Sequence, residues 1–277
     1  MNVRSTIATW VRAVFVASFA VIAVLALVSP GARAQESREQ SDRNDHDGPR
    51  RGLKNVVLVH GAWADGSSWS KVIPLLEARG LHVVAVQNSL TSLAADVATT
   101  KRAIARLDGP VLLVGHSYGG AVITQAGDDP KVAGLVYVAA FAPDLGESVL
   151  DLLTANPTPI ASELVLDQFG FITLTAKGIR EDFAQDLSDT EQAVIIATQG
   201  PTSVASGGTK ITTVAWKFKP TWYAVAKRDR TISPDLERLF AQRMNATTIE
   251  LSSSHVPMLS RPSEVAAFIG RAAAKIQ

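Results

Sequence analysis

The stretch "LVGHSYGG", residues 113–120, decides the fold. It places Ser117 between two glycines at the end of an apolar run, in the pattern G-x-S-x-G. A chain of this length shows that pattern by chance about one time in ten, so the context must support it. Here an apolar strand is expected to end at Gly115, and a helix can begin after Ser117. Such a sharp turn needs small neighbours and lifts the serine hydroxyl off the sheet. A structural turn serine is the alternative.

Apolar runs recur along the chain and alternate with segments of helical periodicity. Strands that are apolar on both faces and alternate with helices are typical of a parallel sheet covered on both sides. We therefore predict an α/β fold with a mostly parallel sheet between helices. The predicted strands are 55–60, 81–87, 110–115, 132–140, 221–227 and 247–251, and the clearest helices are 91–107, 234–243 and 263–275.

Residues 144–215 break this alternation. The segment is rich in threonine, proline and glycine with scattered leucines, and its helical stretches are expected near 147–153 and 180–196. We predict an inserted helical cap over the sheet, and a plain extra helical layer is the alternative.

The first 34 residues have the layout of a secretory signal peptide. Arg4 and Arg12 precede an apolar run over 13–28, and Ala32-Arg33-Ala34 has the form of a cleavage site. We therefore expect a protein that is exported to the periplasm or secreted. An uncleaved segment that anchors the chain in the membrane is the alternative, because the run approaches the length of a span.

Residues 35–53 are charged and almost without apolar side chains, which predicts a flexible linker before a globular domain over 54–277.

Removal of residues 1–34 takes away three arginines and no acids, which leaves 24 basic and 26 acidic residues, a net charge of −2. This balance gives no electrostatic reason to expect nucleic acid or a membrane surface as a partner. The chain has no cysteine, which excludes a cysteine nucleophile and a thiolate metal site.

A serine nucleophile needs a base. His255, in "SSSHVPMLSRP", follows the last predicted strand, where a loop can bring the imidazole over Ser117. The other histidines are expected in the linker, at strand ends or inside the serine turn with the side chain directed away from the serine. They are His46, His60, His82 and His116.

The base needs an acid to orient it. Asp229, in "VAKRDRTISP", lies just beyond a predicted strand, and the resulting order Ser, Asp, His is the one expected for this turn architecture. Asp235 is the alternative, although it is expected to open a helix, where an acid needs no catalytic explanation.

When a serine attacks a carbonyl group, the negative charge that develops on the carbonyl oxygen needs hydrogen-bond donors. We expect the backbone N–H of Tyr118, directly after the nucleophile, and that of Ala62, in the loop after the first strand. Gly61 would let the backbone approach the substrate, and Trp63 would wall the pocket; a turn glycine and a core aromatic are the respective alternatives.

Four motifs taken together resemble the α/β-hydrolase superfamily from about residue 54 to the end. They are "LVHGAWADGSSW", "VGHSYGG", "KRDRTISP" and "SSHVPMLSRP", in that order. Within the superfamily the chain looks most like the small branch of plant methylesterases, plant hydroxynitrile lyases and their bacterial esterase relatives. The resemblance implies Ser117, Asp229 and His255 as the catalytic triad, with Ala62 and Tyr118 lining the oxyanion hole.

The same branch contains two chemistries. Its lyases are known for a lysine beside the catalytic histidine and a threonine after the first-strand histidine, whereas Val256 and Gly61 occupy those positions here. We therefore expect an exported serine hydrolase that cleaves a small, uncharged carboxylic ester through an acyl-enzyme, with no metal or organic cofactor. A lactonase or acyltransferase with the same triad is the alternative, and a hydroxynitrile lyase or a non-catalytic binding protein is less favoured.

Overall fold

The computed structural model describes residues 53–276. The predicted signal peptide over 1–34 and almost all of the predicted linker over 35–53 lie outside the described residues. Leu53, the last residue assigned to that linker, is only 5% exposed and packs into the core. The folded domain therefore includes at least one residue more than the predicted boundary at residue 54.

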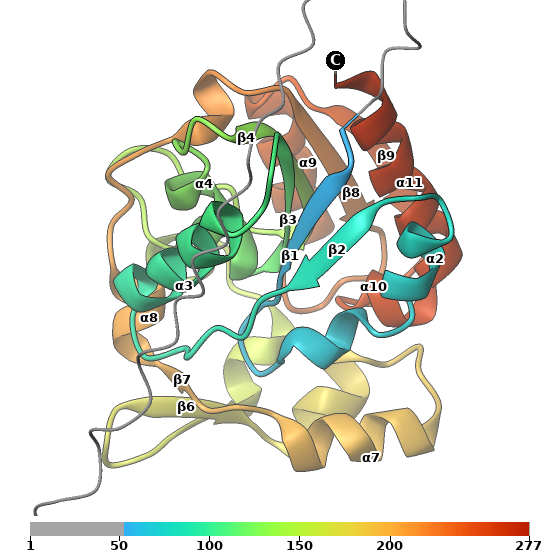
Figure 1. Cartoon of the computed structure of the whole chain (residues 1–277). Helices are drawn as coiled ribbons and strands as arrows, with labels where there is room; N and C mark the ends of the chain where they lie inside the picture. The colour runs from blue at the N-terminus through green and yellow to red at the C-terminus, as the bar shows by residue number, and fades with distance from the viewer. Residues whose placement is uncertain (1–52, 277) are drawn as a thin grey trace, which may run out of the picture. The chain divides into compact units, whose positions relative to one another are not determined.

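Within the described residues, six parallel strands form the central sheet (Figure 1). The inner strands are almost wholly buried and mostly apolar on both faces, as expected when helices cover both sides, whereas the two edge strands are partly exposed. The predicted α/β fold is thus confirmed. In spatial order the strands are β2 (His82–Ala85), β1 (Asn55–Val59), β3 (Val111–Ser117), β4 (Val132–Ala140), β8 (Thr221–Ala226) and β9 (Thr247–Leu251).

Helices pack on both faces of the sheet. α2 and α11 contact each other, and α3 and α4 contact each other on the other side in Figure 1. The serine turn lies between β3 and α4, so the sheet and this helix together fix its position. The helices around the central sheet are α2 (Ile73–Glu77), α3 (Leu93–Ala105), α4 (Gly119–Ala126), α9 (Pro234–Arg243), α10 (Pro257–Ser260) and α11 (Pro262–Lys275).

The segment between β4 and β8 contains the predicted cap, but it is not only helical. Three short antiparallel strands form a second sheet in it. The helix predicted over 180–196 is also divided, because a π-helical turn ends at Phe183 and Ser188 then caps a new helix with its side chain. The cap elements are α5 (Val149–Ala155), β5 (Leu164–Leu166), β6 (Phe171–Leu174), α6 (Ala176–Gly178), α7 (Asp189–Thr198), β7 (Thr202–Ser203) and α8 (Val204–Gly208).

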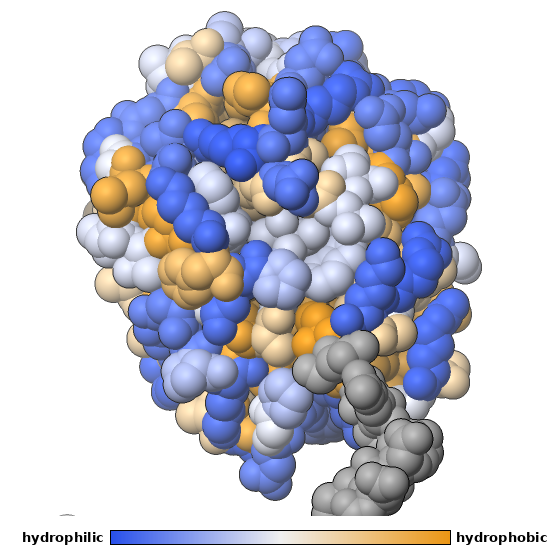
Figure 2. Space-filling view, turned by 90° about the horizontal axis from the view of Figure 1, so that it is seen from above, coloured by the Kyte–Doolittle hydropathy of each residue, from blue (hydrophilic) through white to orange (hydrophobic). Residues whose placement is uncertain are grey.

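The cap covers one end of the sheet. Figure 1 shows β6, β7 and α7 beyond the carboxyl ends of the strands, where ligands bind in open α/β sheets. Figure 2 looks onto the opposite end, where hydrophobic residues are scattered among hydrophilic ones. Across residues 53–276, no helix combines the length and the apolar character needed to cross a bilayer.

Candidate active site

Ser117 is the last residue of β3 and has a positive φ of 52°. This left-handed conformation is rare outside glycine, and it marks a strained turn that presents the side chain. The flanking glycines are required by close backbone contacts. A Cβ on Gly115 would lie 2.6 Å from the carbonyl oxygen of Gly119, and one on Gly119 would lie 2.5 Å from that of Val59. The structure therefore supports the predicted sharp turn.

The structure brings together the three side chains predicted to react. The hydroxyl of Ser117 lies 2.8 Å from Nε2 of His255, and Nδ1 of His255 lies 2.5 Å from Oδ2 of Asp229. All three are buried, and each lies at or just beyond the carboxyl end of a different strand of the central sheet. The serine hydroxyl can donate to Nε2 while Nδ1–H donates to the carboxylate, which is the arrangement that a serine–histidine pair needs for proton transfer.

Asp229 is held by its own loop. Its Oδ1 accepts hydrogen bonds from the backbone N–H groups of Thr231, at 2.7 Å, and Ile232, at 2.9 Å. The second oxygen is thereby left facing the imidazole. The alternative acid, Asp235, has a side chain that is 91% exposed and pairs with Arg238 on α9. Of these two candidates, Asp229 is the one that contacts His255.

Two buried histidines form hydrogen bonds to main-chain groups around the site. His116 donates from Nε2 to the main-chain carbonyl of His255 at 2.8 Å, and burial together with the nearby His255 keeps the pKa of His116 well below its usual value. His60 accepts the N–H of Asn88 at Nε2, 2.9 Å away, and burial lowers its pKa as well. Both are neutral at pH 7. Their partners are distant in sequence, so no local pattern reveals these contacts.

Glu237 is a buried residue near Asp229 that the sequence analysis did not identify. It lies on the buried face of α9, and one carboxyl oxygen accepts the N–H of Ala226 at 3.0 Å. Burial, followed by the negative charge of Asp229, raises the pKa of Glu237 well above its usual range. The carboxyl of Glu237 therefore keeps its proton to a higher pH than a solvent-exposed glutamate does. The available signal was an acid at an apolar position of the helical period.

The two predicted oxyanion donors lie on separate segments that meet at the serine. Ala62 and Tyr118 both line the cavity that contains Ser117. Gly61, predicted to bind substrate, does not line that cavity. A Cβ on Gly61 would instead lie 2.6 Å from the Cβ of Ser117, so this glycine makes room for the nucleophile.

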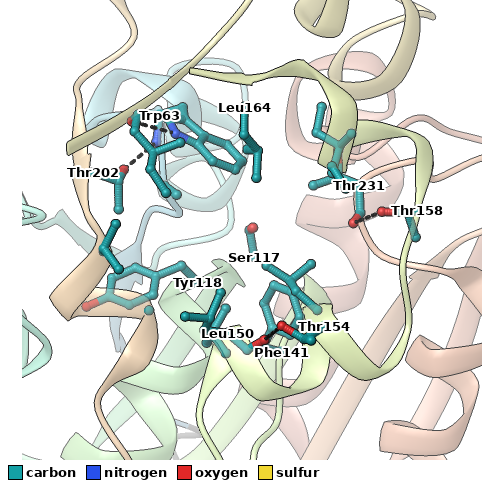
Figure 3. A pocket seen from close by; sticks show the side chains of 18 of the residues that line it. Trp63, Ser117, Tyr118, Phe141, Leu150, Thr154, Thr158, Leu164, Thr202 and Thr231 are labelled. Atoms are coloured by element: carbon teal, nitrogen blue, oxygen red, sulfur yellow. Dashed lines mark hydrogen bonds between the residues drawn. The ribbon is translucent and has the colours of Figure 1, made fainter. Parts of the chain in front are cut away.

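Trp63 lines the cavity, with its indole over Ser117 (Figure 3). The indole N–H donates to the carbonyl of Ile172 at 3.0 Å, and its backbone N–H donates to Oγ1 of Thr202 at 3.3 Å. Both partners belong to the cap sheet. Trp63 therefore joins the loop after β1 to the cap.

The cavity has a volume of about 240 Å³ and is mostly apolar. No charged side chain lines it within the described part of the chain, and several of its lining residues are serines and threonines. Across residues 53–276, no group of three or more histidine, cysteine, aspartate or glutamate side chains is placed to hold a metal ion. Aliphatic and aromatic side chains form most of the wall, among them Trp63, Phe141, Val149, Leu150, Leu153, Ile160, Leu164 and Ile172.

Comparison with known proteins agrees with this geometry. Residues 56–268 match the model of an alpha/beta hydrolase family, and the chain belongs to that family. It is 28% identical over 236 residues to methylesterase 8 of Arabidopsis thaliana, covering 76% of this chain and 85% of that enzyme.

A second relative matches over a shorter region. The chain is 34% identical over 128 residues to a carbendazim hydrolyzing esterase of Nocardioides sp., which covers 41% of this chain and about half, 53%, of that enzyme. Among solved structures, a pyrethroid hydrolase superposes with a TM-score of 0.71 at 24% identity, covering 80% of this chain and 98% of the other. This last similarity supports the fold alone. The family and the names of the two relatives support a carboxylic-ester hydrolase.

Proposed function

We propose that this protein is a serine carboxylic-ester hydrolase with Ser117 as nucleophile, His255 as general base and Asp229 as the acid that orients the base. The observation that carries the proposal is the continuous chain of hydrogen bonds from Ser117, in the wall of the cavity, through His255 to Asp229. A serine on a strained turn that contacts a histidine oriented by a buried carboxylate is suited to acyl transfer.

The reaction proceeds in two halves. The oxygen of Ser117 attacks the ester carbonyl carbon while Nε2 of His255 takes the hydroxyl proton, and the backbone N–H groups of Ala62 and Tyr118 bind the oxyanion. As the tetrahedral intermediate collapses, the ester C–O bond breaks and His255 returns the proton to the leaving alcohol. Water then attacks the acyl-enzyme with the same proton transfers, which releases the carboxylic acid and restores Ser117.

The cavity lining favours an uncharged substrate of modest size. A charged substrate group would leave water without gaining a partner of opposite charge, and an isolated buried charge is strongly disfavoured. The apolar wall instead stabilises aliphatic or aromatic groups in proportion to the area they bury. We propose a small neutral ester as the substrate class.

The position beside His255 supports hydrolysis over cyanohydrin cleavage. Val256 is buried there, where the resemblance places a lysine in the lyases. A valine supplies no positive charge for a cyanide leaving group.

We also propose that the protein is exported and that residues 1–34 are removed. The basic start, the apolar run and the Ala32-Arg33-Ala34 site support this proposal. Fractionation of cells that express the full chain, followed by mass determination, tests it. The expected product lies outside the cytoplasm and begins at Gln35. An uncleaved chain in the membrane fraction would support an anchor instead.

Hydrolysis of a chain-length series of p-nitrophenyl esters tests the function. We expect turnover by the wild-type protein, an optimum that reflects the cavity, and a loss of at least about a thousandfold in the Ser117→Ala variant. Equal inactivity of the two folded proteins toward these esters, and toward lactones, would contradict the proposal.

A further inference from the structure

The side chain of Tyr118 is anchored away from the substrate cavity. Its ring lines the cavity, but its hydroxyl points away from Ser117 (Figure 3) and donates to Oδ2 of Asp96 at 2.9 Å. Asp96 lies on α3 and is fully buried. No lysine, arginine or histidine of the described residues pairs with it in a salt bridge. A buried carboxylate without a cation is costly, so its neutral donors must hold it in place.

The other oxygen of Asp96 fixes the loop that precedes α3. It accepts the backbone N–H of Leu90 at 3.1 Å and the hydroxyl of Ser89 at 3.2 Å. Leu90 has a φ of 56°, which a leucine adopts only when its surroundings enforce it. The carbonyl of Leu90 also accepts the N–H of Ser203 from cap strand β7 at 2.8 Å.

The same loop reaches the segment that contains the other oxyanion donor. Asn88 donates its backbone N–H to Nε2 of His60 at 2.9 Å and its side-chain amide to the carbonyl of His60 at 3.3 Å. His60 ends the run that leads through Gly61 to Ala62. Residues 88–90 are thus hydrogen-bonded to the Ala62 segment at one end and, through Asp96, to Tyr118 at the other.

We propose that Asp96 is a positioning residue for the oxyanion hole, and that its bridge to residues 88–90 holds the amides of Ala62 and Tyr118 at a fixed separation. This inference rests on the proposed function. Two donors on different chain segments can bind one oxygen only if their spacing is set before the reaction. The bond from Leu90 to Ser203 adds the cap to the same bridge, so the seating of the cap and the geometry of the hole are linked.

The direct test removes the tyrosine hydroxyl and leaves the ring. Tyr118→Phe is compared with Tyr137→Phe, a matched control that also loses a buried hydroxyl. The hydroxyl of Tyr137 is hydrogen-bonded to that of Thr124 at 2.9 Å, and neither residue lines the cavity. The measurements are kcat and KM with the best p-nitrophenyl ester, and the Ki of a trifluoromethyl ketone of matched chain length. That ketone forms a bond from its carbonyl carbon to the oxygen of Ser117, and its own oxygen becomes an oxyanion in the hole.

We expect Tyr118→Phe to lower kcat on the order of tenfold, less than the loss of a whole donor, with KM little changed and Ki raised by a similar factor. Tyr137→Phe should change none of the three constants kcat, KM and Ki. The double variant Asp96→Asn/Tyr118→Phe should lose no more than the more damaged single variant, because both substitutions break one bridge.

Two results would overturn the inference alone: wild-type turnover with equal kcat and Ki in the Tyr118 and Tyr137 variants, or additive losses in the double variant. If Asp96→Asn does not fold, the comparison of the two tyrosine variants still decides. A wild-type protein that does not turn over esters would overturn the proposed function and this inference together.

Discussion

His116, the residue before the nucleophile, donates a hydrogen bond from Nε2 to the main-chain carbonyl of His255 at 2.8 Å. The two rings are buried, with centroids 4.8 Å apart. The strained turn that presents Ser117 therefore also holds the backbone of the proposed base. Nucleophile and base are fixed relative to each other by adjacent residues of β3.

Loss of this donor should slow the reaction without weakening substrate binding. We expect His116→Leu to lower kcat on the order of tenfold with KM nearly unchanged, because the base shifts while the cavity wall is kept. His116→Gln, which retains an N–H donor, should recover part of the loss. His82→Gln, at an exposed position outside the site, is the control. Equal kcat in the leucine and wild-type proteins would contradict a positioning role for His116.

The choice between the two candidate acids gives a sharp comparison. Asp229→Asn should lower kcat by about 10⁴, because an amide can hold His255 in the wrong tautomer. Asp235→Asn makes the same chemical change at an exposed site and should leave kcat unchanged. Steady-state kinetics on the pair, with circular dichroism to verify folding, provides the measurement. A small effect at residue 229 would remove the aspartate from the proposed mechanism.

Glu237 should make the folded protein less stable as the pH rises. In the unfolded chain this carboxyl ionises around its ordinary pKa of 4.5, whereas burial and the charge of Asp229 raise its pKa in the folded state. The unfolded state then binds fewer protons, so the free energy of unfolding falls as the pH rises above 4.5, at most about 1.4 kcal/mol per unit.

The Glu237→Gln variant imitates the protonated acid and should escape this penalty. Urea unfolding of both proteins from pH 4.5 to 8 should show the variant gaining on the wild type as the pH rises. A stability difference that is constant over this range would mean that Glu237 has the same proton affinity in both states.

Trp63 lies between the cavity that contains Ser117 and a second cavity of about 270 Å³, because it lines both. We expect Trp63→Ala to join the two spaces and to raise the relative kcat/KM for bulky esters over acetate. Trp63→Phe keeps most of the ring but loses the indole bond to Ile172. If size alone matters, Phe should behave like the wild type. An unchanged ester preference in the alanine variant would show that Trp63 does not limit the substrate.

The sequence predicted the parts of this protein that depend on local pattern. The inner strands of the central sheet are mostly apolar runs, and the glycines around Ser117 reflect backbone contacts that any residue with a Cβ would break. The cap strands were missed because β5 is only three residues long and exposed throughout, so it shows no alternation. The partners of Tyr118 and Asp229 were missed for another reason. Asp96 and Glu237 are acids on helices, and only the tertiary packing buries them against the site.

Identification of the acylated residue tests most directly whether Ser117 is the nucleophile. The protein is mixed with excess p-nitrophenyl ester, quenched in acid during turnover, digested and analysed by peptide mass spectrometry. We expect one acyl group, located on Ser117, and none in the Ser117→Ala variant treated in parallel. Acylation of a different residue, or ester hydrolysis by the alanine variant at the wild-type rate, would contradict this role of Ser117.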